Sequence, residues 1–175
     1  MRARLFVAAI VLQALVLVGW AAGLDLQLAR APRIRLEVVQ RDPRDLLRGD
    51  YVMLQYAIDE IPLEMIAGGR PEHGDRLWVT LEPKDGLHVA VAASRARMTL
   101  APEQRLIVGH VRSFMGPGTR GGTSPRVFVE YGIERLYVAE GRGMVPRGRV
   151  EAELALPSSG RALLIRLFVD GRPYP

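Results

Sequence analysis

Residues 150–169 read VEAELALPSSGRALLIRLFV and contain two runs in which apolar and polar side chains alternate. The apolar positions are Val150, Ala152, Leu154 and Leu156 in the first run, and Leu163, Ile165, Leu167 and Val169 in the second. A period of two places such residues on one face of a β-strand, and the Pro-Ser-Ser-Gly sequence at 157–160 favours a turn. The stretch predicts an antiparallel hairpin with Leu154, Ile165 and Leu167 buried and the charged side chains Glu151, Glu153 and Arg166 on the outer face.

The same alternation recurs upstream of this hairpin. It is found in residues 33–38, 51–58, 76–82, 87–93, 105–114 and 126–133, and Leu106, Val108 and His110 set its phase in the fifth of these segments. The Asp85-Gly86 pair favours a tight hairpin turn, and the Gly- and Pro-rich residues 115–125 favour a loop. We detect no internal repeat. The sequence therefore predicts an all-β domain, an antiparallel sandwich or barrel of about eight strands.

The N-terminal segment has a different character. Residues 5–24 carry no charge, and Gln13 is their one polar side chain. Twenty helical residues span about 30 Å, which matches the hydrocarbon core of a bilayer. A cleaved signal peptide is the competing interpretation, because Arg2 and Arg4 precede the apolar run. We expect a retained anchor over residues 1–24 with a cytoplasmic N-terminus, a linker over 25–32, and an extracytoplasmic domain over 33–175.

Composition narrows the function classes. The 175 residues include no cysteine, which excludes disulfides, Cys-ligated metals and cysteine nucleophiles. Of the 24 basic residues, 23 are arginines and only Lys84 is a lysine. They are scattered, and aromatic residues make up 6% of the chain, so we expect no nucleic-acid partner. No ligand set for a metal and no phosphate-binding glycine pattern is recognisable, and we expect no cofactor.

One local string stands out: residues 42–56, which read DPRDLLRGDYVMLQY. Asp42-Pro43 favours a turn, and Gly49-Asp50 allows the chain to enter a strand sharply. Within that strand Leu54 and Tyr56 share a face. The string fits a hydrogen-bonded buried tyrosine at the start of a strand, and it also fits a ligand site.

Residues 49–56 (GDYVMLQY) resemble the signature of the GDYXXLXY family, bacterial membrane-anchored proteins named for that motif. Residues 131–141 (YGIERLYVAEG) resemble a later stretch of the same family, although Leu136 and Ala139 depart from its pattern. The resemblance spans roughly residues 1–170. It implies a single N-terminal transmembrane helix in the bacterial inner membrane and an exported, periplasmic domain. It implies no established activity and supplies no catalytic residues.

These observations favour binding over catalysis. We expect a membrane-anchored interaction module whose partner is another envelope membrane protein. The alternative is a small hydrolase or ligand-binding domain that uses paired carboxylates, and a third interpretation is a module that faces anionic lipids. Residues 49–56 and 131–141 are expected to come together in space. The candidate binding residues in them are Arg48, Asp50, Tyr51, Tyr56, Tyr131, Glu134 and Glu140, with Asp50, Glu134 and Glu140 as the acids of the alternative.

Overall fold

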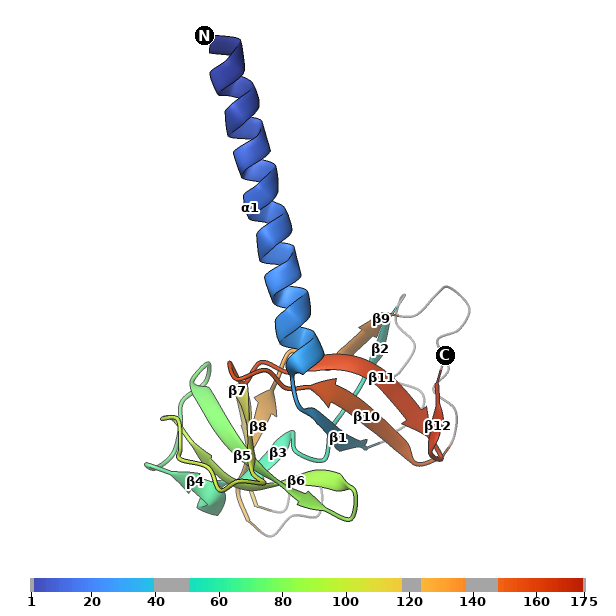
Figure 1. Ribbon diagram of the computed structural model, residues 1–175. Coiled ribbons are helices and arrows are strands. Elements are labelled where there is room, and N and C mark those ends of the chain that lie inside the picture. Colours follow the sequence, from blue (N-terminus) through green and yellow to red (C-terminus); the bar gives the residue numbers. More distant parts are fainter. Residues whose placement is uncertain (1, 40–50, 118–123, 138–147, 175) are drawn as a thin grey trace.

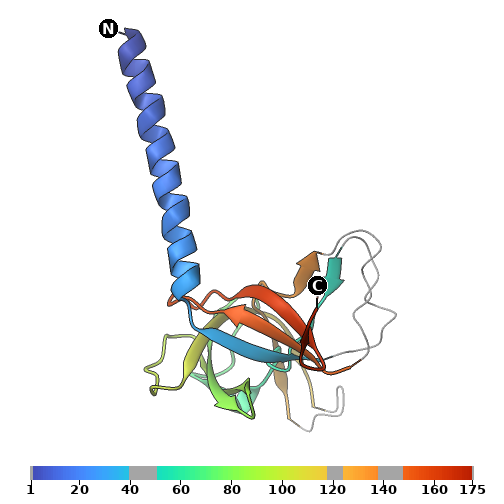
Figure 2. The ribbon, with the colours of Figure 1, turned by 45° about the vertical axis from the view of Figure 1, so that its right-hand side comes forward.

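A computed structural model describes residues 2–39, 51–117, 124–137 and 148–174. It has one long helix, α1 (Arg2–Arg30), which stands away from a β-domain (Figures 1 and 2). The strands are β1 (Arg33–Val38), β2 (Tyr51–Met53), β3 (Glu60–Pro62), β4 (Ile66–Ala67), β5 (Arg76–Lys84), β6 (Leu87–Ser94), β7 (Arg105–Met115), β8 (Arg126–Glu130), β9 (Arg135–Tyr137), β10 (Val150–Ala155), β11 (Leu163–Val169) and β12 (Arg172–Pro173). A short 3₁₀ helix, η1 (Leu63–Met65), precedes β4. The predicted all-β class with one N-terminal apolar helix is confirmed.

The helix α1 is long and apolar enough to cross a membrane, over Ala9–Arg30. Every residue from Ala9 to Gln27 is exposed, including Leu15 and Trp20, and only near the end of the helix is a side chain, that of Leu28, half-buried. It continues through residues 25–30, which the sequence suggested as part of a linker, and only Ala31 and Pro32 separate it from β1.

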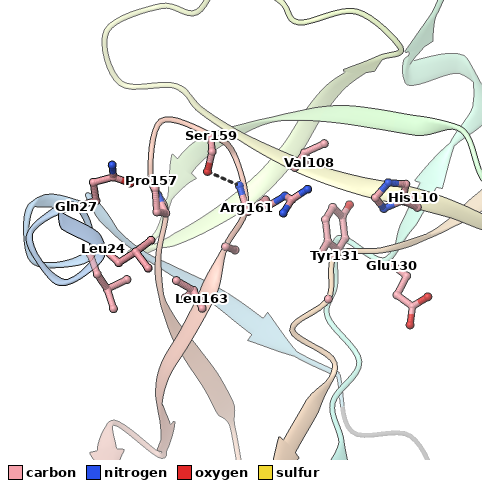
Figure 3. A pocket seen from close by; sticks show the side chains of 13 residues that line it. Leu24, Gln27, Val108, His110, Glu130, Tyr131, Pro157, Ser159, Arg161 and Leu163 are labelled. Atoms are coloured by element: carbon pink, nitrogen blue, oxygen red, sulfur yellow. Dashed lines mark hydrogen bonds between the residues drawn. The ribbon is translucent and has the colours of Figure 1, made fainter. Parts of the chain in front are cut away.

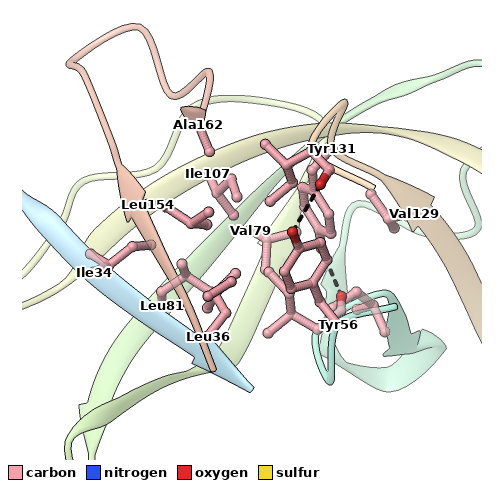
Figure 4. Packing of buried hydrophobic residues seen from close by; sticks show 14 of the residues in the cluster. Ile34, Leu36, Tyr56, Val79, Leu81, Ile107, Val129, Tyr131, Leu154 and Ala162 are labelled. Carbon is pink, nitrogen blue, oxygen red and sulfur yellow. Dashed lines mark hydrogen bonds between the residues drawn. The ribbon is translucent and has the colours of Figure 1, made fainter. Parts of the chain in front are cut away.

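Two sheets enclose one core. The first has the order β1-β10-β11-β12 and the second the order β3-β8-β7-β5-β6-β4. β2 pairs with β9 in a separate two-stranded sheet. The chain that follows β2 makes an isolated bridge to β1, between Tyr56 and Val38, so β9 and β2 continue the first sheet in the order β9-β2-β1-β10-β11-β12. Figure 4 shows Ile34, Leu36 and Leu154 of the first sheet packed against residues of the second.

The two halves of the domain have the same architecture, although the sequence analysis found no repeat. Exchanging β1, β2, β3, β5 and β6 with β7, β8, β9, β10 and β11, in that order, converts β9-β2-β1-β10-β11 into β3-β8-β7-β5-β6. The end strands β12 and β4 are not equivalent, because β12 is antiparallel to β11 and β4 is parallel to β6. The register agrees as well: residues 51–62 and the residues 75 positions later, 126–137, make equivalent pairs. Each half has one bulged hairpin: the register shifts after Thr80 in the β5–β6 hairpin and after Glu153 in the β10–β11 hairpin, two residues from the position equivalent to Thr80. The halves exchange strands, since β1 pairs with β10 and β7 pairs with β5.

The predicted strand phase was wrong for β7 and for the first part of β11. The bulge after Glu153 shifts the register of β11, so Leu163 is 49% exposed and Ile165 is only half-buried, while Leu154 and Leu167 are buried as predicted. In β7 the residues that join the central core are Ile107 and Val111. Leu106 and Val108, which set the predicted phase, lie on the opposite face and are covered by the connection between β10 and β11.

The second predicted strand is shorter than expected. It ends at Met53, but Leu54, Tyr56 and Ile58 keep their side chains in the core beyond it. The Asp85-Gly86 turn is confirmed, with both residues at positive φ (52° and 81°) as a tight hairpin turn of this type needs. Of the predicted loop at 115–125, Met115 belongs to β7 and residues 118–123 lie outside the described residues.

Candidate functional site

The two motif segments pair with each other. β2 pairs antiparallel with β9, and beyond the strands the Leu54 amide donates a hydrogen bond to the Glu134 carbonyl at 2.7 Å. The prediction that residues 49–56 and 131–141 come together is thus confirmed for the described part of both segments. The equivalent bond of the other half runs from the Val129 amide to the Asp59 carbonyl at 2.8 Å.

Tyr56 and Tyr131 fasten these segments by reciprocal hydrogen bonds, which we call the tyrosine clasp. The Tyr56 hydroxyl donates to the carbonyl of Ile133, and the Tyr131 hydroxyl donates to the carbonyl of Ile58, each at 2.8 Å (Figure 4). Both tyrosines are buried, where a hydroxyl needs a partner. Each one finds its partner in the segment that carries the other.

A buried carboxylate follows each tyrosine by three residues. Asp59 accepts the amide N–H of Tyr56 on Oδ2 at 2.8 Å, and Glu134 accepts the amide N–H of Tyr131 on Oε1. Only 2% of Asp59 and 6% of Glu134 is exposed. These contacts close each turn on itself, so Glu134 has a structural role. The sequence analysis named Glu134 and missed Asp59, and the spacing Tyr-x-Ile-acid, present at both 56–59 and 131–134, is the signal that would have found it.

The electrostatics of the clasp oppose acid–base chemistry. Burial raises the pKa of the Tyr56 hydroxyl, and the charges of Glu134 and Asp59 raise that pKa further. Burial likewise raises the pKa of Tyr131 well above its ordinary value, with the same two carboxylates adding to the effect. A general acid or base works best with a pKa near the operating pH. The clasp therefore consists of fixed neutral donors.

The remaining predicted site residues are not placed by the structure. Arg48, Asp50 and Glu140 lie outside the described residues. Tyr51 begins β2, opposite Tyr137, but its side chain is not among those described. Their assignment as binding residues stays a prediction.

A pocket of about 610 Å³ lies between the end of α1 and the β-domain (Figure 3). Its apolar wall includes Leu24 and Leu28 of the helix and the exposed Leu163 of β11. Its polar wall includes His110, Ser159 and Arg161. A cavity with one apolar and one polar side suits an amphipathic ligand. Sequence reasoning missed this pocket because its walls come from separate segments of the chain, within 24–28, 108–110, 130–132 and 157–163.

A second pocket, of about 250 Å³, shares Pro157 with the first and is lined by Arg97, Arg105 and Pro32. Arg97 donates from Nη2 to the carbonyl of Ser158 at 3.0 Å, which ties it to the turn between the two pockets. We call the surface formed by the two pockets and the turn at 157–160 the proximal face, because α1 ends beside it.

The proximal face carries uncompensated positive charge. Ion pairs with described carboxylates are made by arginines that do not line either pocket: Arg35, Arg95, Arg112, Arg126, Arg149 and Arg166. Within the described part of the chain, Arg97, Arg105 and Arg161 have no carboxylate partner. The acid of the first pocket, Glu130, is already paired with Arg112 at 2.9 Å.

Across the residues that the structure describes, no three His, Asp or Glu side chains are grouped so that they could hold a metal ion.

A family model described as GDYXXLXY protein matches residues 13–167. The match begins within α1 and includes both halves of the β-domain. The chain belongs to the GDYXXLXY family. No curated protein and no solved structure matches it. In this GDYXXLXY protein, the last two fixed positions of the family motif are structural, since Leu54 is a core residue and Tyr56 makes the clasp.

Proposed function

We propose that this GDYXXLXY protein is a single-pass protein of the bacterial inner membrane whose periplasmic β-domain acts by binding. Its partner is another envelope membrane protein. Arg2 and Arg4 precede the apolar run and favour a cytoplasmic N-terminus. The short distance between α1 and β1 supports a domain that is held against the membrane surface, where it can meet a membrane-embedded partner.

The observation that carries the proposal is the position of Gln13. It lies near the middle of the uncharged run 5–24, exposed on α1, and has no hydrogen-bond partner within the described part of the chain. An amide in hydrocarbon is costly unless it is hydrogen-bonded, and a polar side chain on a neighbouring helix can satisfy it. Such pairs stabilise helix association by about 0.6–2 kcal/mol. Gln13 therefore favours a second helix against α1.

The hydrolase alternative loses support at Glu134. That carboxylate is buried and already accepts a backbone N–H of its own turn, so it is poorly placed to receive a proton from a substrate. No described residue favours this alternative over binding.

Photo-crosslinking in native membranes tests the proposal. A photoreactive side chain at position 9 or 17, one helical turn from Gln13, should crosslink to a second membrane protein. The same group at position 11 or 15, on the opposite face, should not. Gln13→Leu should abolish the crosslink from position 17, and Gln13→Asn, which keeps the amide, should preserve much of it.

Three results would contradict the proposal. Equal crosslinking from all four positions would mean that α1 has no preferred face. A crosslinked product that contains only two copies of this 19.4 kDa chain would show that the chain associates with itself rather than with a different protein. An unchanged crosslink in Gln13→Leu would remove Gln13 from the interface.

A further inference from the structure

We infer that the proximal face binds the phosphate headgroup of an anionic phospholipid in the leaflet from which the β-domain emerges. The inference goes beyond the proposed function but rests on one part of it, the placement of α1 across the bilayer. According to this inference, the two pockets beside the helix bind a lipid of the surrounding membrane.

Depth places the pockets at the headgroup layer. The uncharged run ends at Leu24, and Leu28 lies about 6 Å further along the helix axis. The headgroup region of a bilayer adds roughly 5–8 Å on each side of the hydrocarbon core. Leu24 and Leu28 both line the first pocket, and Pro32 lines the second. Lipid headgroups therefore occupy the same layer as the openings of the pockets.

Chemistry selects an anionic lipid. Arg161, Arg97 and Arg105 line the two pockets, and no described carboxylate forms an ion pair with them. Arg97 donates one hydrogen bond to the Ser158 carbonyl, and Arg105 donates from Nη1 to the carbonyls of Pro102 and Gln104, so each keeps further N–H donors for a phosphate. An arginine can hold a phosphate through two parallel hydrogen bonds, which suits it to a phosphodiester. The apolar wall of the first pocket, with Leu163 exposed beside Leu24, gives the upper part of an acyl chain a surface to contact.

The chain contains its own reporter of this site. Trp78 is one of two tryptophans, and a Cβ on Gly160 would lie only 2.7 Å from its ring, so the ring packs beneath the 157–160 turn. The guanidinium of Arg97 lies 5.6 Å from the centre of the same ring. In a Trp20→Phe chain, the fluorescence of Trp78 therefore reports on molecules that approach this turn.

The test uses the full Trp20→Phe chain in phosphatidylcholine nanodiscs. Each preparation contains a small fraction of a nitroxide-labelled lipid, which is either phosphatidylglycerol or phosphatidylcholine. In both lipids the nitroxide is attached at the same position, near the headgroup end of one acyl chain. We expect the nitroxide phosphatidylglycerol to quench Trp78 more strongly, and added salt to reduce the difference. Arg161→Gln should lower the apparent affinity for phosphatidylglycerol roughly fivefold, and adding Arg97→Gln should lower it further by a similar factor.

The matched control removes the same charge elsewhere. Lys84→Gln with Arg172→Gln neutralises two exposed cations outside both pockets and should leave the preference unchanged. Arg161→Gln is compared first, because Arg97 lies near the reporter ring and its loss can alter the fluorescence directly. Melting curves of each variant confirm that it is folded.

The outcomes separate the inference from the proposal. Equal and substantial quenching by both lipids would overturn the inference and leave the placement of α1 intact. An equal loss of preference in the control pair would overturn it too, since net charge would then be the cause. Quenching by neither lipid would mean that the domain does not lie at the bilayer, which removes the placement on which the proposed function depends.

Discussion

At Tyr56 a single hydroxyl joins positions 77 residues apart in the chain. The carbonyl that accepts its hydrogen bond belongs to Ile133, whose side chain is buried, and water is not at hand to replace the donor. Tyr131 makes the same contact in the opposite direction. The free energy of each contact is modest, but the cost of leaving its acceptor unpaired is larger.

Tyr56→Phe and Tyr131→Phe should therefore each lower the free energy of unfolding by about 1–3 kcal/mol. Denaturant titration of the full chain in detergent, followed by near-UV circular dichroism, measures this. Ser113→Ala, which removes an exposed hydroxyl from β7, is the control and should cost less than about 0.5 kcal/mol. Tyrosine variants as stable as this control would show that the clasp contributes nothing.

The clasp should also set an alkaline limit to stability. Because the pKa of each clasp tyrosine is raised in the folded state, the folded protein keeps protons that the unfolded chain releases above about pH 10. Stability should be fully present below that pH and fall as the pH rises beyond it. Unfolding titrations at a series of alkaline pH values should give a shallower fall in Tyr56→Phe than in the unaltered chain. An identical pH dependence of the two proteins would contradict this assignment.

At the scale of elements, alternation located the strands but did not always identify their buried face. β7 is apolar on both faces, because the β10–β11 connection covers Leu106 and Val108 on the side away from the core. β11 begins in one phase and ends in another, because a bulge falls opposite the boundary between Glu153 and Leu154. A period of two carries no information about either effect, since both depend on residues far away in the sequence.

The bulge predicts an uneven response along the C-terminal hairpin. Leu154→Ala and Leu167→Ala should each lower the free energy of unfolding by about 2–5 kcal/mol, because both residues are buried in the core. Ile165→Ala should cost less, and Leu163→Ala, at an exposed position, less than about 0.5 kcal/mol. Denaturant midpoints of the four variants test this order. A large loss in Leu163→Ala would mean that the uninterrupted alternation of the sequence describes the hairpin better than the bulge.

At the scale of the whole molecule, the sequence predicted the β class and the apolar helix but not the duplicated architecture. The equivalent segments 51–62 and 126–137 share few identities, chiefly Val52 with Val127, Tyr56 with Tyr131, and Ile58 with Ile133. Gly49-Asp50 has no counterpart in the second half, where Ser124-Pro125 stands. The two halves therefore resemble each other in their backbone pairing more than in their sequences. Because each half contributes a strand to the other's sheet, the domain should unfold as one unit.

The orientation of the whole chain is the last prediction. A reporter that is active only outside the cytoplasm, fused after Pro175, should be active, and the purified protein should keep the N-terminal residues through Leu24. Arg2 and Arg4 favour this orientation, because positively charged residues beside a membrane-spanning helix tend to stay in the cytoplasm. Arg30 and Arg33, on the other side of the apolar run, weaken this preference. Arg2→Glu with Arg4→Glu should therefore reduce the active fraction, whereas Arg30→Glu with Arg33→Glu should not. A mature N-terminus at Leu24 or Asp25 would show instead that the segment is a cleaved signal. Cleavage there would release the domain from the bilayer, so neither a partner of Gln13 nor a lipid at the proximal face could be held in place.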